Sequence, residues 1–174
     1  MSAINVYAEA IHNIAAAEGK LSEVEDELFQ LAQLFETNEE LRAAITDPHA
    51  PVAARQQVME DLLHGKVSRT TVGVVSLVIG AGHAADLPAV ARAVLETGAA
   101  TRNHAVAEVR SAVPLTDAQR KRLAAALKSA TGKDVEIKVV IDPTVLGGII
   151  TQIGDTVIDG SVRHRLNRVR ESLG

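Results

Sequence analysis

The chain has 174 residues, of which 47% are hydrophobic and 23% charged, with a formal net charge of −4. This composition indicates a soluble globular protein of one or two domains and excludes collagen-like and disordered chains. The absence of Cys excludes disulfide frameworks, thiolate metal sites and thiol redox chemistry.

The first part of the sequence has a helical period. Up to about residue 104, apolar residues recur every three or four positions, which is typical of amphipathic helices. A capping box is expected at Ser22 and Glu25, where the second helix would begin. Six helices are predicted, over about 4–18, 22–36, 38–46, 52–63, 68–81 and 86–104.

The second part alternates between apolar and polar residues, which is typical of strands. Strands are predicted over 105–113, 134–141, 146–153 and 156–159, with a tight turn at Gly154 and Asp155. A helix is expected between the first two strands, with a capping box at Thr116 and Gln119 and an end at Gly132. A last helix should begin near Ser161.

The predicted fold is therefore α+β, with an N-terminal six-helix bundle over residues 1–104 and a small mixed α/β domain over 105–174. The two parts differ in charge. Residues 1–104 hold seven Lys and Arg against fourteen Asp and Glu, whereas residues 105–174 hold eleven against eight. The formal charges of −7 and +3 suggest that the two domains have different partners.

No motif in the sequence predicts catalysis or a cofactor. The six histidines lack the three- or four-residue spacing of helical metal ligands, and no phosphate-binding or dinucleotide-binding glycine pattern is present. The acidic run 25–27 is expected on a solvent-facing helix surface. With three aromatic residues, no Trp and a negative net charge, nucleic-acid binding is not expected.

Secretion and membrane crossing are not expected either. The N-terminus lacks the basic and apolar regions of a signal peptide. The longest uncharged stretch, residues 70–85, is shorter than the ~20 apolar residues of a spanning helix.

Two apolar surfaces are candidates for binding partner helices. The first would lie on the first and fifth helices, where small residues allow close approach; its predicted residues are Tyr7, Ala10, Ile11, Ile14, Gly73, Ser76, Leu77 and Gly80. The second is on the last helix and comprises Val162, Arg165, Leu166 and Val169. The alternatives are that the first set is ordinary bundle core and that the last helix covers the sheet.

Residues 142–166, which run from Asp142-Pro143-Thr144 to His164-Arg165-Leu166, resemble the C-terminal signature of a known family. This is the delta subunit family of bacterial F-type ATP synthase, which is related to the mitochondrial oligomycin-sensitivity-conferring protein. Residues 7–11 (Tyr-Ala-Glu-Ala-Ile) and 82–90 resemble two further segments of the family. Glu9 and His164 depart from it, since Lys and Gly are usual at those positions.

The resemblance implies a non-catalytic stator subunit without a cofactor. Helices one and five would hold the N-terminal helix of an alpha subunit, and the C-terminal domain would hold the C-terminal end of the b subunit. The protein would be peripheral to the cytoplasmic face of the cell membrane through the complex. Two alternatives remain open: a helical adaptor outside ATP synthase, and a hydrolase that uses Asp155, Asp159 or Ser161.

Overall fold

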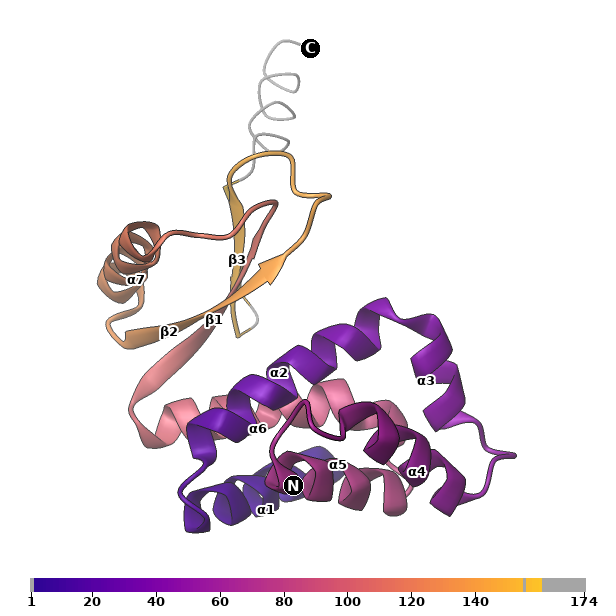
Figure 1. The fold of residues 1–174 in the computed structure, drawn as a ribbon. Coiled ribbons are helices and arrows are strands. Elements are labelled where there is room, and N and C mark those ends of the chain that lie inside the picture. Colours follow the sequence, from indigo (N-terminus) through magenta and orange to yellow (C-terminus); the bar gives the residue numbers. More distant parts are fainter. Residues whose placement is uncertain (1, 155, 161–174) are drawn as a thin grey trace. The chain divides into compact units, whose positions relative to one another are not determined.

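The computed structural model describes residues 2–154 and 156–160 (Figure 1). The chain divides into two compact units, Met1–Gly98 and Ala99–Gly174. The first contains a helical core, and the second contains a separate core between a helix and a sheet.

The first unit is helical. Its elements are α1 (Ala3–Ala17), α2 (Leu21–Thr37), α3 (Glu39–Thr46), α4 (Val52–Leu63), α5 (Arg69–Gly80), the 3-10 helix η1 (Ala84–Asp86) and α6 (Leu87–Thr101), whose last turn belongs to the second unit. Asn38 begins α3 by accepting a hydrogen bond from the backbone N–H of Leu41 at 2.9 Å. Ser68 begins α5 in the same way, through Thr71.

The predicted six-helix bundle is wrong as a description of the helices. The described residues form seven α-helices and a four-stranded sheet, and η1 adds a 3-10 helix between α5 and α6. The backbone N–H of Asp86 donates to the carbonyl of His83 at 3.0 Å, which closes this tight turn immediately before α6. A three-residue helix has no apolar period, so the sequence pattern gave no signal for it.

The predicted capping box of α2 is also wrong. Ser22 lies inside the helix, which begins at Leu21 with Lys20 as its N-cap and no side-chain cap. Gly19 has a φ of 67°, and Lys20 donates its N–H to the carbonyl of Ala15 at 2.9 Å. This closure of α1 uses the residues immediately before Leu21, so α2 starts one residue earlier than predicted.

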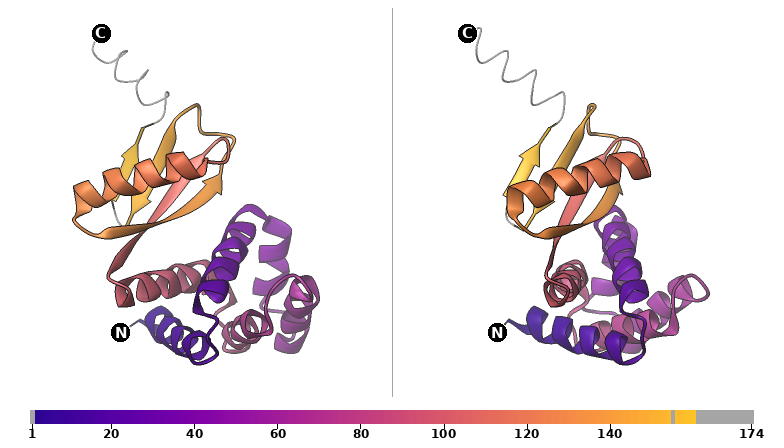
Figure 2. Two further views of the ribbon diagram at one scale, coloured as in Figure 1. Left: turned by 60° about the vertical axis from the view of Figure 1, so that its left-hand side comes forward. Right: turned by 90° about the vertical axis from the view of Figure 1, so that its left-hand side faces the viewer.

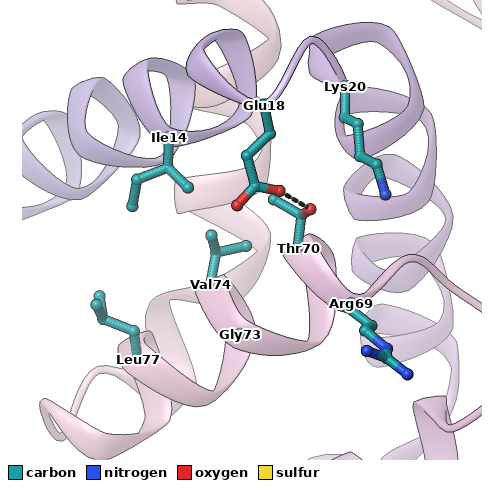
Figure 3. Close-up of a pocket in the computed structure, with 8 residues that line it drawn as sticks. All are labelled: Ile14, Glu18, Lys20, Arg69, Thr70, Gly73, Val74 and Leu77. Carbon is teal, nitrogen blue, oxygen red and sulfur yellow. Dashed lines mark hydrogen bonds between the residues drawn. The ribbon is translucent and has the colours of Figure 1, made fainter.

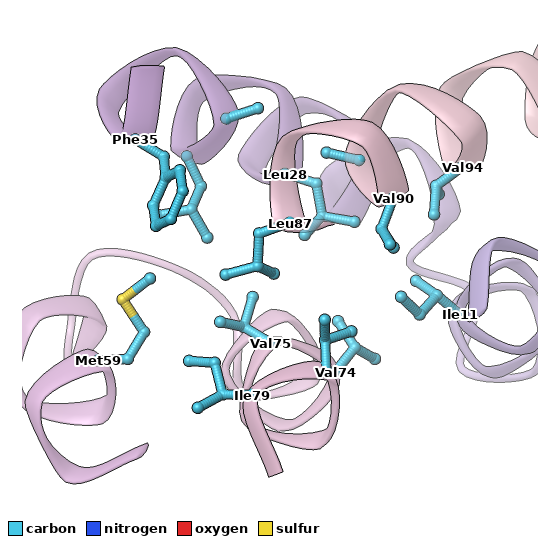
Figure 4. Packing of buried hydrophobic residues seen from close by; sticks show 14 of the residues in the cluster. Ile11, Leu28, Phe35, Met59, Val74, Val75, Ile79, Leu87, Val90 and Val94 are labelled. Atoms are coloured by element: carbon cyan, nitrogen blue, oxygen red, sulfur yellow. The ribbon is translucent and has the colours of Figure 1, made fainter. Parts of the chain in front are cut away.

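The core of the first unit gathers side chains from all six α-helices, α1 to α6, and from η1 (Figure 4). Helix α5 contacts α1, α2 and α4 and buries Val74, Val75, Val78 and Ile79. Each fully buried side chain of this size contributes about 1.5–3 kcal/mol relative to an exposed one. The position of α5 is therefore fixed by packing on several sides.

The second unit is a mixed sheet with the strand order β2-β1-β3-β4. Its strands are β1 (His104–Ser111), β2 (Asp134–Ile141), β3 (Ile149–Ile153) and β4 (Thr156–Asp159), and α7 (Asp117–Thr131) connects the parallel pair β1 and β2. The other two pairings are antiparallel. Helix α7 lies across one face of the sheet (Figure 2), where Leu127 packs with Ala107 and Val109.

Local signals explain several ends of these elements. The capping box of Thr116 and Gln119 is confirmed, and α7 ends at Gly132, which has a left-handed φ of 72°. The predicted strand 146–153 begins only at Ile149, because Gly147 and Gly148 have φ values of 65° and 77° that no extended strand allows.

An ion cluster joins the first residues of β1 to β2. Glu136 accepts from Nε of Arg102 at 2.7 Å and lies 3.1 Å from Nδ1 of His104. Partial burial raises the pKa of Glu136, but the hydrogen bond and charge of Arg102, together with His104, outweigh it and leave the pKa below its ordinary value. The cluster therefore favours a charged Glu136.

The predicted last helix and its four candidate residues, Val162, Arg165, Leu166 and Val169, lie outside the described residues. In the part of the chain that is described, no helix has the length and apolar character needed to cross a membrane.

Candidate helix-binding groove

Helices α1 and α5 lie side by side and run in opposite directions. At one end, the hydroxyl of Thr70 at the start of α5 donates to the carboxylate of Glu18, which follows α1. At the other end, the ring of Tyr7 near the start of α1 lies 5.1 Å from the ring of His83, beyond the end of α5. These two contacts fix the relative direction of the helices.

A surface groove of about 450 Å³ lies between the two helices (Figure 3). Its residues come from α1, the start of α2 and α5: Ile14, Glu18, Lys20, Arg69, Thr70, Gly73, Val74 and Leu77. Ile14 is 39% exposed and Leu77 is 47% exposed, although both are large apolar residues. We call this surface the α1–α5 groove.

Gly73 keeps the groove open at its middle. A Cβ atom built on Gly73 would meet no heavy atom within 4 Å, so the space above this residue is empty. Gly73 has no positive φ, so its backbone does not require glycine. Glycine inside a helix costs about 0.5–1 kcal/mol relative to alanine. The local fold therefore does not require glycine at this position.

Buried hydrogen bonds hold the start of α5 in place. Glu27 of α2 accepts from the backbone N–H and from the hydroxyl of Ser68, both at 2.8 Å, and also from the hydroxyl of Thr71. The positive end of the α5 helix dipole also stabilises a carboxylate at this position. The groove wall formed by α5 is thus rigidly attached to α2.

This network corrects one prediction for the acidic run 25–27. Glu25 is 2% exposed and Glu27 is half-buried, so neither lies on a solvent-facing surface. For Glu27, the sequence pattern gave the wrong side because the polar start of α5 packs against its carboxylate. Asp26 alone of the three is exposed.

The predicted groove residues fall into three sets: residues that line the groove, other residues of α1, and residues of α5 that lie against α4. Ile14, Gly73 and Leu77 line the α1–α5 groove. On α1, Tyr7 is half-buried, Ala10 is exposed and Ile11 is core at 1% exposure.

Ser76 and Gly80 lie against α4 instead. The hydroxyl of Ser76 donates to Glu60 at 2.9 Å, and Nε2 of Gln56 donates to the carbonyl of Ser76 at 2.8 Å. A Cβ atom on Gly80 would lie 2.8 Å from the same Gln56 nitrogen. The small residues of α5 therefore serve two different neighbours.

Sequence reasoning missed the polar members of the groove, which are Glu18, Lys20, Arg69 and Thr70. They lie at the ends of three helices rather than on an apolar stripe. The predicted end of the first helix near Gly19 indicated that Glu18 and Lys20 lie near a turn. The apolar period did not indicate that Arg69 and Thr70 lie beside them.

The described residues hold no group of three or more His, Asp or Glu side chains that could bind a metal ion. Of the three residues in the hydrolase alternative, Asp155 and Ser161 are outside the described residues. Asp159 ends β4 and pairs with Ile150 in the sheet.

The sequence matches one protein family over residues 4–173, described as the ATP synthase delta (OSCP) subunit. Two relatives are the ATP synthase subunits delta of Nocardia farcinica, 40% identical over 95% of this chain, and of Streptomyces avermitilis, 38% identical over 94%. The chain spans only 61% and 60% of the lengths of these two relatives.

Solved structures show the same fold. A chain of the Toxoplasma gondii mitochondrial ATP synthase hexamer has a TM-score of 0.62 at 24% identity and covers 99% of this chain and 98% of its own length. A chain from the Polytomella F-ATP synthase head and rotor has a TM-score of 0.54 at 27% identity, over 59% of this chain and 90% of its own. The family match over residues 4–173 shows that this chain belongs to the ATP synthase delta (OSCP) subunit family.

Proposed function

We propose that this chain is a non-catalytic stator subunit of an F-type ATP synthase. Its helical unit binds the N-terminal helix of an alpha subunit, and its second unit binds the C-terminal end of the b subunit. The observation that carries this proposal is the α1–α5 groove, which exposes Ile14 and Leu77 on either side of an unfilled Gly73. Membership of the family supports the placement in ATP synthase.

The groove has the properties of a site for an amphipathic helix. Its apolar residues come from two antiparallel helices, and its middle lacks a side chain, so a third helix can approach closely. Burying Ile14, Leu77 and the facing side chains contributes about 25 cal/mol for each Å² of apolar surface, before the cost of ordering the partner. Binding by this route requires no chemical step.

The stator role needs two binding surfaces on one chain. Rotation of the central stalk would turn the catalytic head unless the head is held from outside, and a subunit with one unit on the head and another on the peripheral stalk provides that hold. The chain has two compact units with separate cores, which is consistent with one binding surface on each unit. Such a subunit sits at the cytoplasmic face of the cell membrane through its complex.

Binding of a labelled peptide tests this proposal. The peptide is the N-terminal segment of the alpha subunit from the same organism, and fluorescence anisotropy measures its affinity for the full chain. We expect binding by the unaltered chain and at least a tenfold loss with Gly73→Leu, whose side chain would fill the groove.

The matched control is Ala43→Leu, which adds the same side chain at an exposed position of α3 outside the groove. It should bind the peptide as the unaltered chain does. No binding by the unaltered chain at high micromolar concentration would contradict the proposal. An equal loss with both variants would contradict the assignment to this groove.

A further inference from the structure

The α1–α5 groove carries an unusual concentration of positive charge. Residues 1–98 contain six Lys and Arg against fourteen Asp and Glu, so this unit is strongly acidic. Two of those six cations, Lys20 and Arg69, line the same groove. The side chain of neither residue forms a hydrogen bond or an ion pair with any residue that the structure describes, and both residues are exposed.

Both cations lie at one end of the groove. Lys20 immediately precedes α2 and Arg69 is the first residue of α5, while Leu77 lies two turns further along α5 (Figure 3). Glu18 lies at the same end, but its carboxylate accepts the hydroxyl of Thr70. Among the residues that line the groove, this end therefore has one carboxylate and two cations. Glu27 lies outside the groove lining, where its carboxylate is engaged by Ser68 and Thr71 at the N-terminus of α5.

The opposite end has a different character. There, Tyr7 of α1 contacts His83, and Nδ1 of His83 lies 2.8 Å from the carboxylate of Asp86. The side chain of Asp86 is 44% exposed. The groove lining therefore holds two cations near the α5 N-terminus and is apolar at Gly73 and Leu77, whereas the partly exposed carboxylate of Asp86 lies outside this lining, beyond the end of α5.

We propose that this charge arrangement makes the groove bind its helix in one direction, with carboxylates of the partner helix against Lys20 and Arg69. The inference rests on the proposed function, since it concerns the helix that the groove accepts. The partner is an amphipathic helix with an apolar stripe and acidic residues gathered towards one end. A helix placed the other way round would bring its carboxylates towards Asp86 and leave both cations unpaired.

The expected contribution is modest, because exposed ion pairs are weak and are screened by salt. Pairs of this kind typically contribute about 0.2–1 kcal/mol each. Two of them would change the dissociation constant by roughly twofold to thirtyfold at low salt. Apolar burial supplies most of the affinity, while charge selects the direction.

A double-mutant cycle tests the charge contribution. One peptide is the alpha N-terminal segment, and the second is the same segment with each Asp and Glu changed to Asn and Gln. Each is measured against the unaltered chain and against Lys20→Gln/Arg69→Gln. Both substituted side chains are exposed, so thermal melting should show an unchanged fold.

We expect the acidic peptide to bind the unaltered chain about twofold to thirtyfold more tightly than its amide version, and the two to bind the double variant equally. High salt should remove the difference. Equal binding of both peptides to the unaltered chain would overturn the inference and leave the proposed function intact. Failure of both peptides to bind would instead contradict the proposed function itself.

A distance measurement tests the direction. The chain has no Cys, so Ala17→Cys places a single thiol at the exposed end of α1 beside Lys20, where a nitroxide can be attached. We expect the nitroxide to broaden the NMR signals of the acidic end of the bound peptide most strongly. Strongest broadening at the other end, or equal broadening of both ends, would overturn the proposal.

Discussion

Glu27 and Ser68 are 41 positions apart in the chain, yet the carboxylate of Glu27 accepts both the backbone N–H and the hydroxyl of Ser68 at 2.8 Å. This pair attaches the start of α5 to α2. Since α5 forms one wall of the α1–α5 groove, the groove depends on a hydrogen-bond network outside it.

Removal of Glu27 should destabilise the helical unit. In Glu27→Ala, the Ser68 and Thr71 groups lose their acceptor, and hydrogen bonds to charged groups contribute about 1.5–3 kcal/mol. We expect a loss of about 2–3 kcal/mol in urea unfolding. Gln30→Ala, at an exposed position of the same helix, is the control and should change stability by less than about 0.5 kcal/mol. Equal effects would show that the network contributes little.

Gly73→Ala should separate stability from binding. Because a Cβ atom fits without contact and the helix gains a better helix former, we expect the free energy of unfolding to rise by about 0.5–1 kcal/mol. The methyl group narrows the groove, so partner binding should weaken while stability increases. Urea unfolding and peptide anisotropy check the two effects; a variant that is both more stable and binds more tightly would contradict the role given to Gly73.

Aspartate substitutions at two positions of α5 should have different effects, one on partner binding and the other on folding. Leu77→Asp places a carboxylate on an exposed groove side chain, so we expect a folded protein that binds the partner helix poorly. Val75→Asp buries the carboxylate in the core and should unfold the helical unit. Circular dichroism distinguishes the two, and unfolding by Leu77→Asp would show that this face is core.

The stability of the sheet should depend on pH through Glu136. The pKa of Glu136 is lowered in the folded state from an ordinary value of 4.5. Its contribution to the free energy of unfolding is therefore complete above pH 4.5 and is lost as the pH falls through the folded-state pKa. Glu136→Gln should therefore lower the protection of β1 and β2 amides against hydrogen exchange at pH 7, by an amount on the order of 1 kcal/mol. At pH 3 the difference from the unaltered chain should be smaller. An equal difference at both pH values would contradict the ion cluster.

Local chemistry made much of the fold predictable. The β2 bounds 134–141 and the α4 bounds 52–63 agree with the structure, because breakers or polar residues flank a clear period. The 3-10 helix η1 and the early start of α2 were missed, since both depend on how the preceding helix closes.

The groove was predictable only in part. Ile14, Gly73 and Leu77 lie where small and apolar residues on two helices suggested. Ser76 and Gly80 share a similar pattern but meet Gln56 of α4, and periodicity cannot tell which neighbour a small face contacts. Lys20 and Arg69 come together only through the packing of α1, α2 and α5, so their joint position had no sequence signal.

Site-specific cross-linking in the assembled complex would identify the protein that occupies the α1–α5 groove. Arg69→Cys places a unique thiol of this chain at the exposed end of the α1–α5 groove, where a photoreactive maleimide can be attached without filling the groove at Gly73. The account predicts a cross-link to the N-terminal segment of an alpha subunit, identified by mass spectrometry, and none from the same probe on Ala43→Cys. Efficient cross-linking from position 69 to any other protein, or assembly with this groove empty, would contradict it.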